Sequence, residues 1–218
     1  MPKLNEHYQD LKESYLFAEI AHRVAAYEAE HPDAKIIRLG IGDVTLPLGD
    51  LAIKGLHEGV DAMASAETFK GYGPEQGYAF LRDAISAYYA RNGVSVDAAD
   101  IFISDGAKSD TGNISELFDN DNVILIPDPV YPVYVDSNIM NGKKVTYLSG
   151  NAENNFLPMP DPSVHADIIY LCSPNNPTGV IYSEETLQKI AAILEKKQKE
   201  FGTSIVLLSD EPYRADNR

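Results

Sequence analysis

Residues 168–179 read IIYLCSPNNPTG, an uninterrupted apolar run followed by a motif rich in proline and asparagine. An apolar run without polar alternation is typical of a strand that is buried on both faces, as in a parallel sheet. The prolines and the glycine of Ser173–Gly179 then end the strand. Ligands of open parallel sheets bind beyond the carboxyl ends of the strands. The residues after each strand are therefore the place to look for a functional site.

The same pattern extends in both directions from this stretch. Strands are predicted at 36–39, 101–103, 123–126, 145–148, 168–171 and 204–208, helices at 14–31, 50–64, 78–91, 109–118, 131–141 and 184–200, and loops at 66–77 and 149–165. Ser183 is suited to cap the last of these helices. From residue 100 onward strands and helices alternate, which predicts an α/β fold with a mostly parallel sheet covered by helices on both faces.

Composition excludes several classes of partner. The chain has 18 basic and 33 acidic side chains, a formal charge of −15, which argues against nucleic acid and anionic membranes because both require clustered Lys and Arg. No apolar run is long enough to cross a bilayer, and no metal site is predicted. The single cysteine, Cys172, excludes a disulfide within the chain and fits a cytoplasmic location. Its apolar neighbours favour a buried thiol over a nucleophile.

Two strand ends carry groups suited to a flat phosphorylated ligand. Ser104–Lys108 reads SDGAK and opens a helix, so free backbone N–H groups, the helix dipole and the Lys108 ammonium together favour a phosphate. Residues 127–134 bring two tyrosines between prolines, and Tyr131 is placed to stack on a ring. Each feature alone has a structural alternative, a capped helix start or a tyrosine packed beneath a loop.

The next two strand ends add polar groups for a pyridine ring. Asn176 is placed to donate to a ring oxygen, Asp210 to hold a pyridinium N–H, and Tyr213 to contact the same oxygen. A simple turn and a helix cap are the structural alternatives. All four strand ends together would surround pyridoxal 5′-phosphate.

At this point the chain resembles the LL-diaminopimelate aminotransferases, within the fold-type I aminotransferases. The motifs that carry the resemblance lie between residues 14 and 183: Tyr15-Leu16-Phe17, RLGIGD at 38–43, GYGPEQG at 71–77, SDGAK at 104–108, residues 128–136 and Ser173–Gly179. The resemblance implies a fold-type I large domain, truncated at Arg218. It divides the chain into an N-terminal arm with the start of a small domain, 1–45, and a partial pyridoxal-phosphate-binding domain, 46–218.

The resemblance also implies roles for individual residues. It assigns cofactor binding to Tyr72, Ala107, Lys108, Tyr131, Asn176, Asp210 and Tyr213, and substrate binding to Tyr15, Gly42 and Glu75. Tyr72 and Glu75 would act in the neighbouring subunit, so a homodimer is expected. The implied reaction transfers an amino group between glutamate and tetrahydrodipicolinate, giving 2-oxoglutarate and LL-diaminopimelate for lysine synthesis, with pyridoxal phosphate as electron sink.

Two departures from the family pattern leave alternatives open. The Schiff-base lysine follows the aspartate in these enzymes within a serine-rich motif, and none is found before Arg218, so no catalytic residue is identified and this chain alone is expected to be inactive. Asp210-Glu211-Pro212-Tyr213 stands where the narrow family has Asp-Ala-Ala-Tyr. The alternatives are another class I aminotransferase or carbon–sulfur lyase, and an inactive fragment or cofactor-binding pseudo-enzyme.

Overall fold

The computed structural model describes residues 2–11, 16–38, 46–161 and 163–214. They divide into two compact units, one of Met1–Leu11 with Ser104–Arg218 and one of Lys12–Ile103. This division differs from the boundary after residue 45 that the resemblance implies, and that boundary stays a prediction. Each unit is described by itself.

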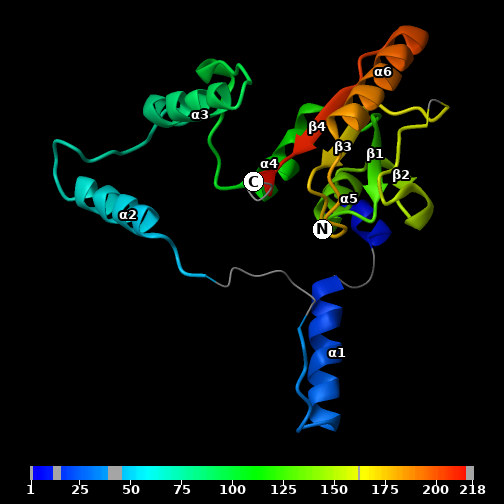
Figure 1. Ribbon diagram of the computed structural model, residues 1–218, viewed down its shortest axis with the longest axis horizontal. Coiled ribbons are helices and arrows are strands. Elements are labelled where there is room, and N and C mark those ends of the chain that lie inside the picture. The colour runs from blue at the N-terminus through cyan, green and yellow to red at the C-terminus, as the bar shows by residue number, and fades with distance from the viewer. Residues whose placement is uncertain (1, 12–15, 39–45, 162, 215–218) are drawn as a thin grey trace. The chain divides into compact units, whose positions relative to one another are not determined.

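The first unit is built on a four-stranded parallel sheet (Figure 1). Its strands are β1 (Val123–Asp128), β2 (Lys144–Ser149), β3 (Ile168–Cys172) and β4 (Val206–Asp210), in the order β2-β1-β3-β4. The parallel sheet and four of the predicted strands are confirmed, the last beginning two residues later than expected. In this register Cys172 pairs with Asp210, which sets the carboxyl ends of β3 and β4 side by side.

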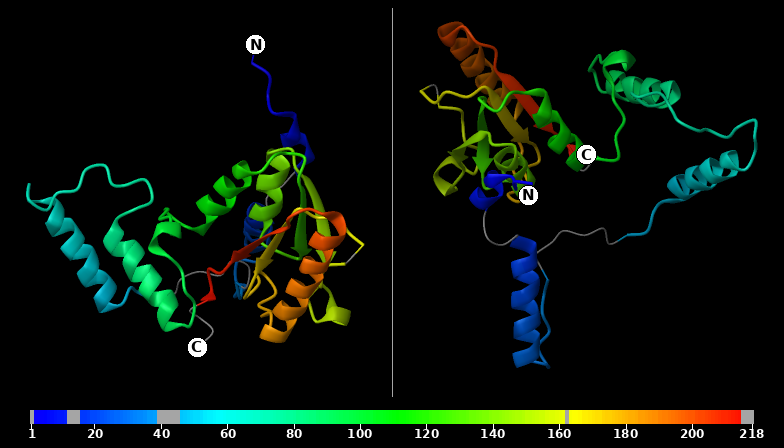
Figure 2. Two further views of the ribbon diagram at one scale, coloured as in Figure 1. Left: turned by 90° about the horizontal axis from the view of Figure 1, so that it is seen from above. Right: turned by 180° about the vertical axis from the view of Figure 1, so that it is seen from behind.

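Helices cover both faces of this sheet, as predicted (Figure 2). The strand side chains point alternately to the two faces and form a separate core with the helices on each face. On one face α6 (Glu184–Phe201) packs Ile190 and Leu194 against strand residues such as Ile169. On the other face Tyr134 of α5 (Pro132–Met140) packs against strand residues such as Tyr170. Each fully buried aliphatic side chain of these cores contributes about 1.5–3 kcal/mol.

Helix α6 has the termini that its sequence predicts. The Ser183 side chain accepts a hydrogen bond from the backbone N–H of Thr186, and Gly202 ends the helix in the left-handed region at φ +67°. The buried ammonium of Lys197 donates to the backbone oxygens of Asp161 and Val164 and so ties the predicted loop 149–165 to the helix. Within that loop the only regular element described is a single 3₁₀ turn, Ala152–Asn154.

Around the carboxyl ends of the strands lies α4 (Ala107–Ile114), which packs beside α5 and continues into a 3₁₀ turn, Ser115–Leu117. The helix therefore begins two residues before the predicted start at 109. The N-terminal 3₁₀ turn Glu6–Asp10 also contacts α5, and Asn5 Nδ2 donates to the backbone oxygen of Met140 at 2.8 Å.

The second unit holds three helices, α1 (Leu16–Glu30), α2 (Asp50–Met63) and α3 (Ala79–Arg91). The predicted helices and the loop at 66–77 are confirmed. Two predicted strands are wrong: among the described residues, 36–38 and 101–103 are not in a strand, because an extended segment forms a ladder only beside a hydrogen-bonded neighbour. Ile103 N–H bonds to the Gln76 carbonyl alone, at 3.0 Å.

Candidate active site

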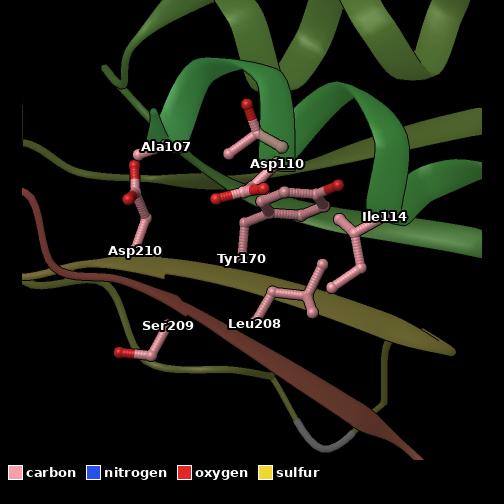
Figure 3. Close-up of a pocket in the computed structure, with 8 residues that line it drawn as sticks. Ala107, Asp110, Ile114, Tyr170, Leu208, Ser209 and Asp210 are labelled. Carbon is pink, nitrogen blue, oxygen red and sulfur yellow. The ribbon is translucent and has the colours of Figure 1, made fainter. Parts of the chain in front are cut away.

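A cavity of about 200 Å³ lies between α4 and the carboxyl ends of β3 and β4 (Figure 3). The described residues that line it are Ala107, Asp110, Thr111, Ile114, Tyr170, Leu208, Ser209 and Asp210. Figure 3 shows Tyr170, Leu208 and Asp210 rising from the strands, with the Asp210 carboxylate pointing toward Ala107 at the start of α4. None of the lining residues is a lysine. The cavity thus has a carboxylate on one wall and a helix N-terminus on the other.

The N-terminus of α4 is held open by its capping residue. Gly106 has φ +148°, a conformation that L side chains rarely adopt, and makes no side-chain cap. Its N–H donates to Ser104 Oγ at 3.2 Å, and the Ser104 hydroxyl donates to Asp110 Oδ2 at 2.8 Å. The first N–H groups of a helix have no partner within the helix, so this end can receive an anion from Ala107 and Lys108. The Lys108 side chain is exposed.

The proline-asparagine motif folds into a turn that is fixed from inside. Asn175 is buried, and its Nδ2 donates to Pro129 O at 3.1 Å and to Thr178 Oγ1 at 2.8 Å. Its backbone N–H and carbonyl bond within the turn to Val180 and Gly179. Asn175 therefore ties the turn to the loop after β1, and this structural role was not identified from the sequence.

Two predicted ring-contacting residues meet beside this turn. Asn176 Nδ2 lies 3.4 Å from Tyr213 Oη, although 37 positions separate the two residues in sequence. Asn176 is half-buried and Tyr213 is exposed. The structure therefore brings together an amide and a phenol that the sequence analysis proposed for the same ring oxygen.

Asp210 has a buried partner that the sequence analysis did not assign. The Tyr134 hydroxyl, from α5, donates a hydrogen bond to Asp210 Oδ2. Burial, followed by the hydrogen bond to Asp210, raises the pKa of Tyr134 well above its usual range, so the phenol stays protonated as a donor. Tyr131 caps the start of α5 and meets the Tyr134 ring edge-on, with centroids 5.9 Å apart. The sequence feature that could have indicated this contact is the spacing of three residues between Tyr131 and Tyr134, which places both near the start of α5.

Of the ten predicted site residues, only Ala107 and Asp210 are among the described residues that line this cavity. Lys108, Tyr131, Asn176 and Tyr213 belong to the same unit but do not line it. Tyr72 and Glu75 belong to the loop before α3 in the second unit, where Tyr72 is fully exposed. Tyr15 and Gly42 lie outside the described residues. The roles of all ten predicted residues stay predictions.

The described ranges, 2–11, 16–38, 46–161 and 163–214, also bear on metal binding and membrane insertion. No group of three or more His, Cys, Asp or Glu side chains there is arranged to hold a metal ion. None of the described helices has both the length and the apolar character of a membrane span.

The chain belongs to the aminotransferase class I and II family, which matches residues 34–215. It is 51% identical to the LL-diaminopimelate aminotransferase of Desulfosudis oleivorans, an alignment that covers 86% of this chain and 48% of that protein. The LL-diaminopimelate aminotransferase of Lachnospira eligens is 47% identical over 99% of this chain and 55% of its own length. The chain thus spans about half the length of the curated relatives it matches.

Solved structures have the same fold. L,L-diaminopimelate aminotransferase from Chlamydomonas reinhardtii superposes with a TM-score of 0.80 at 36% identity, covering 96% of this chain and 52% of that one. An amino transferase from Eubacterium rectale has a TM-score of 0.84 at 24% identity, covering 99% and 56% of the two chains, which supports the fold alone. The fold-type I architecture expected from the sequence is confirmed.

Proposed function

We propose that the chain is the N-terminal part of an LL-diaminopimelate aminotransferase that binds pyridoxal 5′-phosphate between α4 and the ends of β3 and β4. The observation that carries the proposal is the Asp210 carboxylate, which points into the cavity toward the N-terminus of α4. The relatives with this name, at about half identity to the chain, support the particular reaction.

Residues of the cavity and of the neighbouring helix starts and strand ends fit this cofactor chemically. Class I and II aminotransferases depend on pyridoxal phosphate, whose phosphate is anionic and whose ring nitrogen can carry a proton. The N-terminus of α4, with Ala107 and Lys108, suits the phosphate. The Asp210 carboxylate suits the ring N–H, and Asn176 with Tyr213 suits the ring oxygen. Tyr131 at the start of α5 is the proposed stacking ring.

These residues would bind and polarise the ring. When bound, the cofactor supplies an electron sink for amino-group transfer. Asp210 would stabilise positive charge on the ring nitrogen, and it would do so strongly because it lies partly out of water. Asn176 and Tyr213 would fix the orientation of the ring in its plane.

The substrates and the assembly belong to the same proposal. LL-diaminopimelate and glutamate are the proposed amino donors, and 2-oxoglutarate is a proposed amino acceptor. Tyr15 and Gly42 would line the substrate pocket, and Glu75 of a neighbouring subunit would pair with a distal ammonium group. Tyr72 would reach the phosphate across the interface of a homodimer. The single cysteine supports a cytoplasmic location.

The test is substrate preference in the complete protein. We expect kcat/KM for LL-diaminopimelate with 2-oxoglutarate to exceed that for alanine or aspartate by about 100-fold, since a site that pairs with the distal ammonium rejects substrates without it. Transamination of simple amino acids with no turnover of LL-diaminopimelate would contradict the proposal. It would favour another class I aminotransferase or a carbon–sulfur lyase, which the Asp210–Tyr213 sequence supports.

An inactive, cofactor-binding chain is the remaining candidate for residues 1–218 in isolation. The cavity supports it, because no lysine is among its described lining residues. Borohydride reduction in the presence of pyridoxal phosphate, followed by peptide mass mapping, decides the matter. We expect no stoichiometric pyridoxyl-lysine in this chain, and one such peptide would contradict this candidate.

A further inference from the structure

We propose that Tyr134 is a positioning residue for Asp210: its phenol occupies one carboxylate oxygen and leaves the other for the ring nitrogen of the bound cofactor. This inference rests on the proposed function. It concerns a residue of α5 that lies 76 positions from Asp210 in sequence and that does not line the cavity itself.

The contact between the two side chains is specific. Tyr134 is 1% exposed, and its hydroxyl donates to Asp210 Oδ2. Within the described ranges no hydrogen bond reaches the other oxygen, Oδ1. Since Asp210 lines the cavity, Oδ1 is the oxygen that remains for a ligand. Because burial raises the pKa of Tyr134, the phenol stays protonated and remains a hydrogen-bond donor to Oδ2.

The ring of Tyr134 is itself locked in place. It stacks on Tyr170, with centroids 5.2 Å apart and planes 26° from parallel. Asn138, one turn along α5 and 0% exposed, donates from Nδ2 to Tyr134 O at 2.8 Å and to Tyr170 Oη at 3.3 Å. A donor whose ring stacks on Tyr170 and whose backbone is bound by Asn138 keeps the carboxylate in one orientation before the ligand arrives, which is the preorganisation that a binding site requires.

The second carboxylate of the cavity also has a hydroxyl donor. Asp110 of α4 lines the same cavity and accepts a hydrogen bond from Ser104, as Asp210 does from Tyr134. Each carboxylate is thus oriented by its own hydroxyl group, and the donor to Asp210 is a buried one.

The experiment compares two ligands in the complete protein. Affinities are measured by equilibrium dialysis for pyridoxal 5′-phosphate and for its 1-deaza analogue, which has a C–H in place of the ring nitrogen. Tyr134→Phe keeps the ring and its packing. We expect this variant to bind pyridoxal phosphate about tenfold more weakly and the deaza analogue within about twofold of wild type, because only the first ligand uses Asp210.

Tyr182→Phe is the matched control. It also removes one buried phenol, but Tyr182 belongs to the core on the other face of the sheet and does not line the cavity. We expect both ligands to bind this variant within about twofold of wild type. A purely structural role of Tyr134 would instead weaken both ligands equally in Tyr134→Phe.

The outcomes separate this inference from the proposed function. Wild-type protein that binds no pyridoxal phosphate would overturn the proposed function. Wild-type protein that prefers pyridoxal phosphate to the analogue, with the same preference in Tyr134→Phe, would overturn the role of Tyr134 alone. Should Tyr134→Phe fail to fold, 3-fluorotyrosine at position 134 keeps the hydroxyl and makes it a stronger donor. We expect it to increase the preference for the ring nitrogen, and an unchanged preference would overturn the inference.

Discussion

Helices α6 and α2 share an amphipathic pattern but differ in how far their apolar side chains are buried. Both are amphipathic, yet Ile190 of α6 is 1% exposed in the core of the first unit, whereas Leu56 and Val60 of α2 are 58% and 70% exposed. Helical spacing of apolar residues predicts that a helix forms. It does not specify the surface that the apolar face packs against, and that surface is present for α6 and is not found for α2 among the described residues.

The largest expected effect follows from this contrast. Ile190→Ala removes a side chain from the core beneath α6, and we expect the free energy of unfolding to fall by about 2–5 kcal/mol. Leu56→Ala on α2 is the matched control, and we expect a change within about 0.5 kcal/mol because its site is exposed. Urea denaturation followed by circular dichroism measures both. Equal losses in the two variants would mean that α2 is covered as well as α6.

The next test concerns the open N-terminus of α4. Gly106→Ala places a side chain at φ +148°, and we expect it to lower the free energy of unfolding by about 1–3 kcal/mol. Gly112→Ala is the control within the same helix. Its Cβ would meet no atom within 4 Å, so we expect a gain of about 0.5–1 kcal/mol. Two changes of the same sign, measured by urea titration, would contradict the role of Gly106.

A smaller effect on stability is expected at the N-terminus of α6, which has the side-chain cap that α4 lacks. Ser183→Ala removes the hydrogen bond to the Thr186 N–H, and we expect a loss of about 1 kcal/mol. We expect pyridoxal phosphate affinity to stay unchanged, because the N-terminus of α6 is not part of the cavity. Thermal unfolding and equilibrium dialysis check the two halves of this expectation, and a large loss of affinity would show that α6 belongs to the site.

The last expected effect appears only at alkaline pH. Burial, together with the nearby Cys172 thiol, raises the pKa of Tyr182 to about 12 from its ordinary value of 10.0. A folded-state pKa above the unfolded one stabilises the fold fully below about pH 10, and this contribution is lost as the pH rises toward 12. Tyr182→Phe should therefore flatten the fall in stability between these values, measured by urea titration. An unchanged slope would show that Tyr182 does not carry it.

The sequence predicted the strands of the first unit correctly, and it predicted strands at 36–39 and 101–103 that the described structure does not have. The strands at 123–126 and 168–171 are apolar runs with a paired strand on each side, so pattern and environment agree. Residues 101–103 have the same kind of pattern, yet they form no strand in the described structure, and Phe102 is exposed. A strand depends on its neighbour, which a local pattern does not contain.

The candidate site was likewise only partly predictable from the sequence. The residues after each strand were predictable because parallel strands end at one edge of the sheet. The bond from Tyr134 to Asp210 was not, because it depends on α5 folding back across the face of the sheet. Asn175 was missed for a related reason: its side chain fixes a turn from within, whereas the adjacent Asn176 is the one placed to meet Tyr213.

Binding of pyridoxal 5′-phosphate through Asp210, at the ends of β3 and β4 and the start of α4, is the proposal on which the function rests. Its most direct test is equilibrium dialysis of this cofactor with wild-type protein, Asp210→Ala and, as control, Glu211→Gln. Glu211 is the next carboxylate in the chain and does not line the cavity. We expect saturable binding of one cofactor per chain, weakened about tenfold or more by Asp210→Ala and unaffected by Glu211→Gln. Binding of equal strength to all three proteins would contradict it.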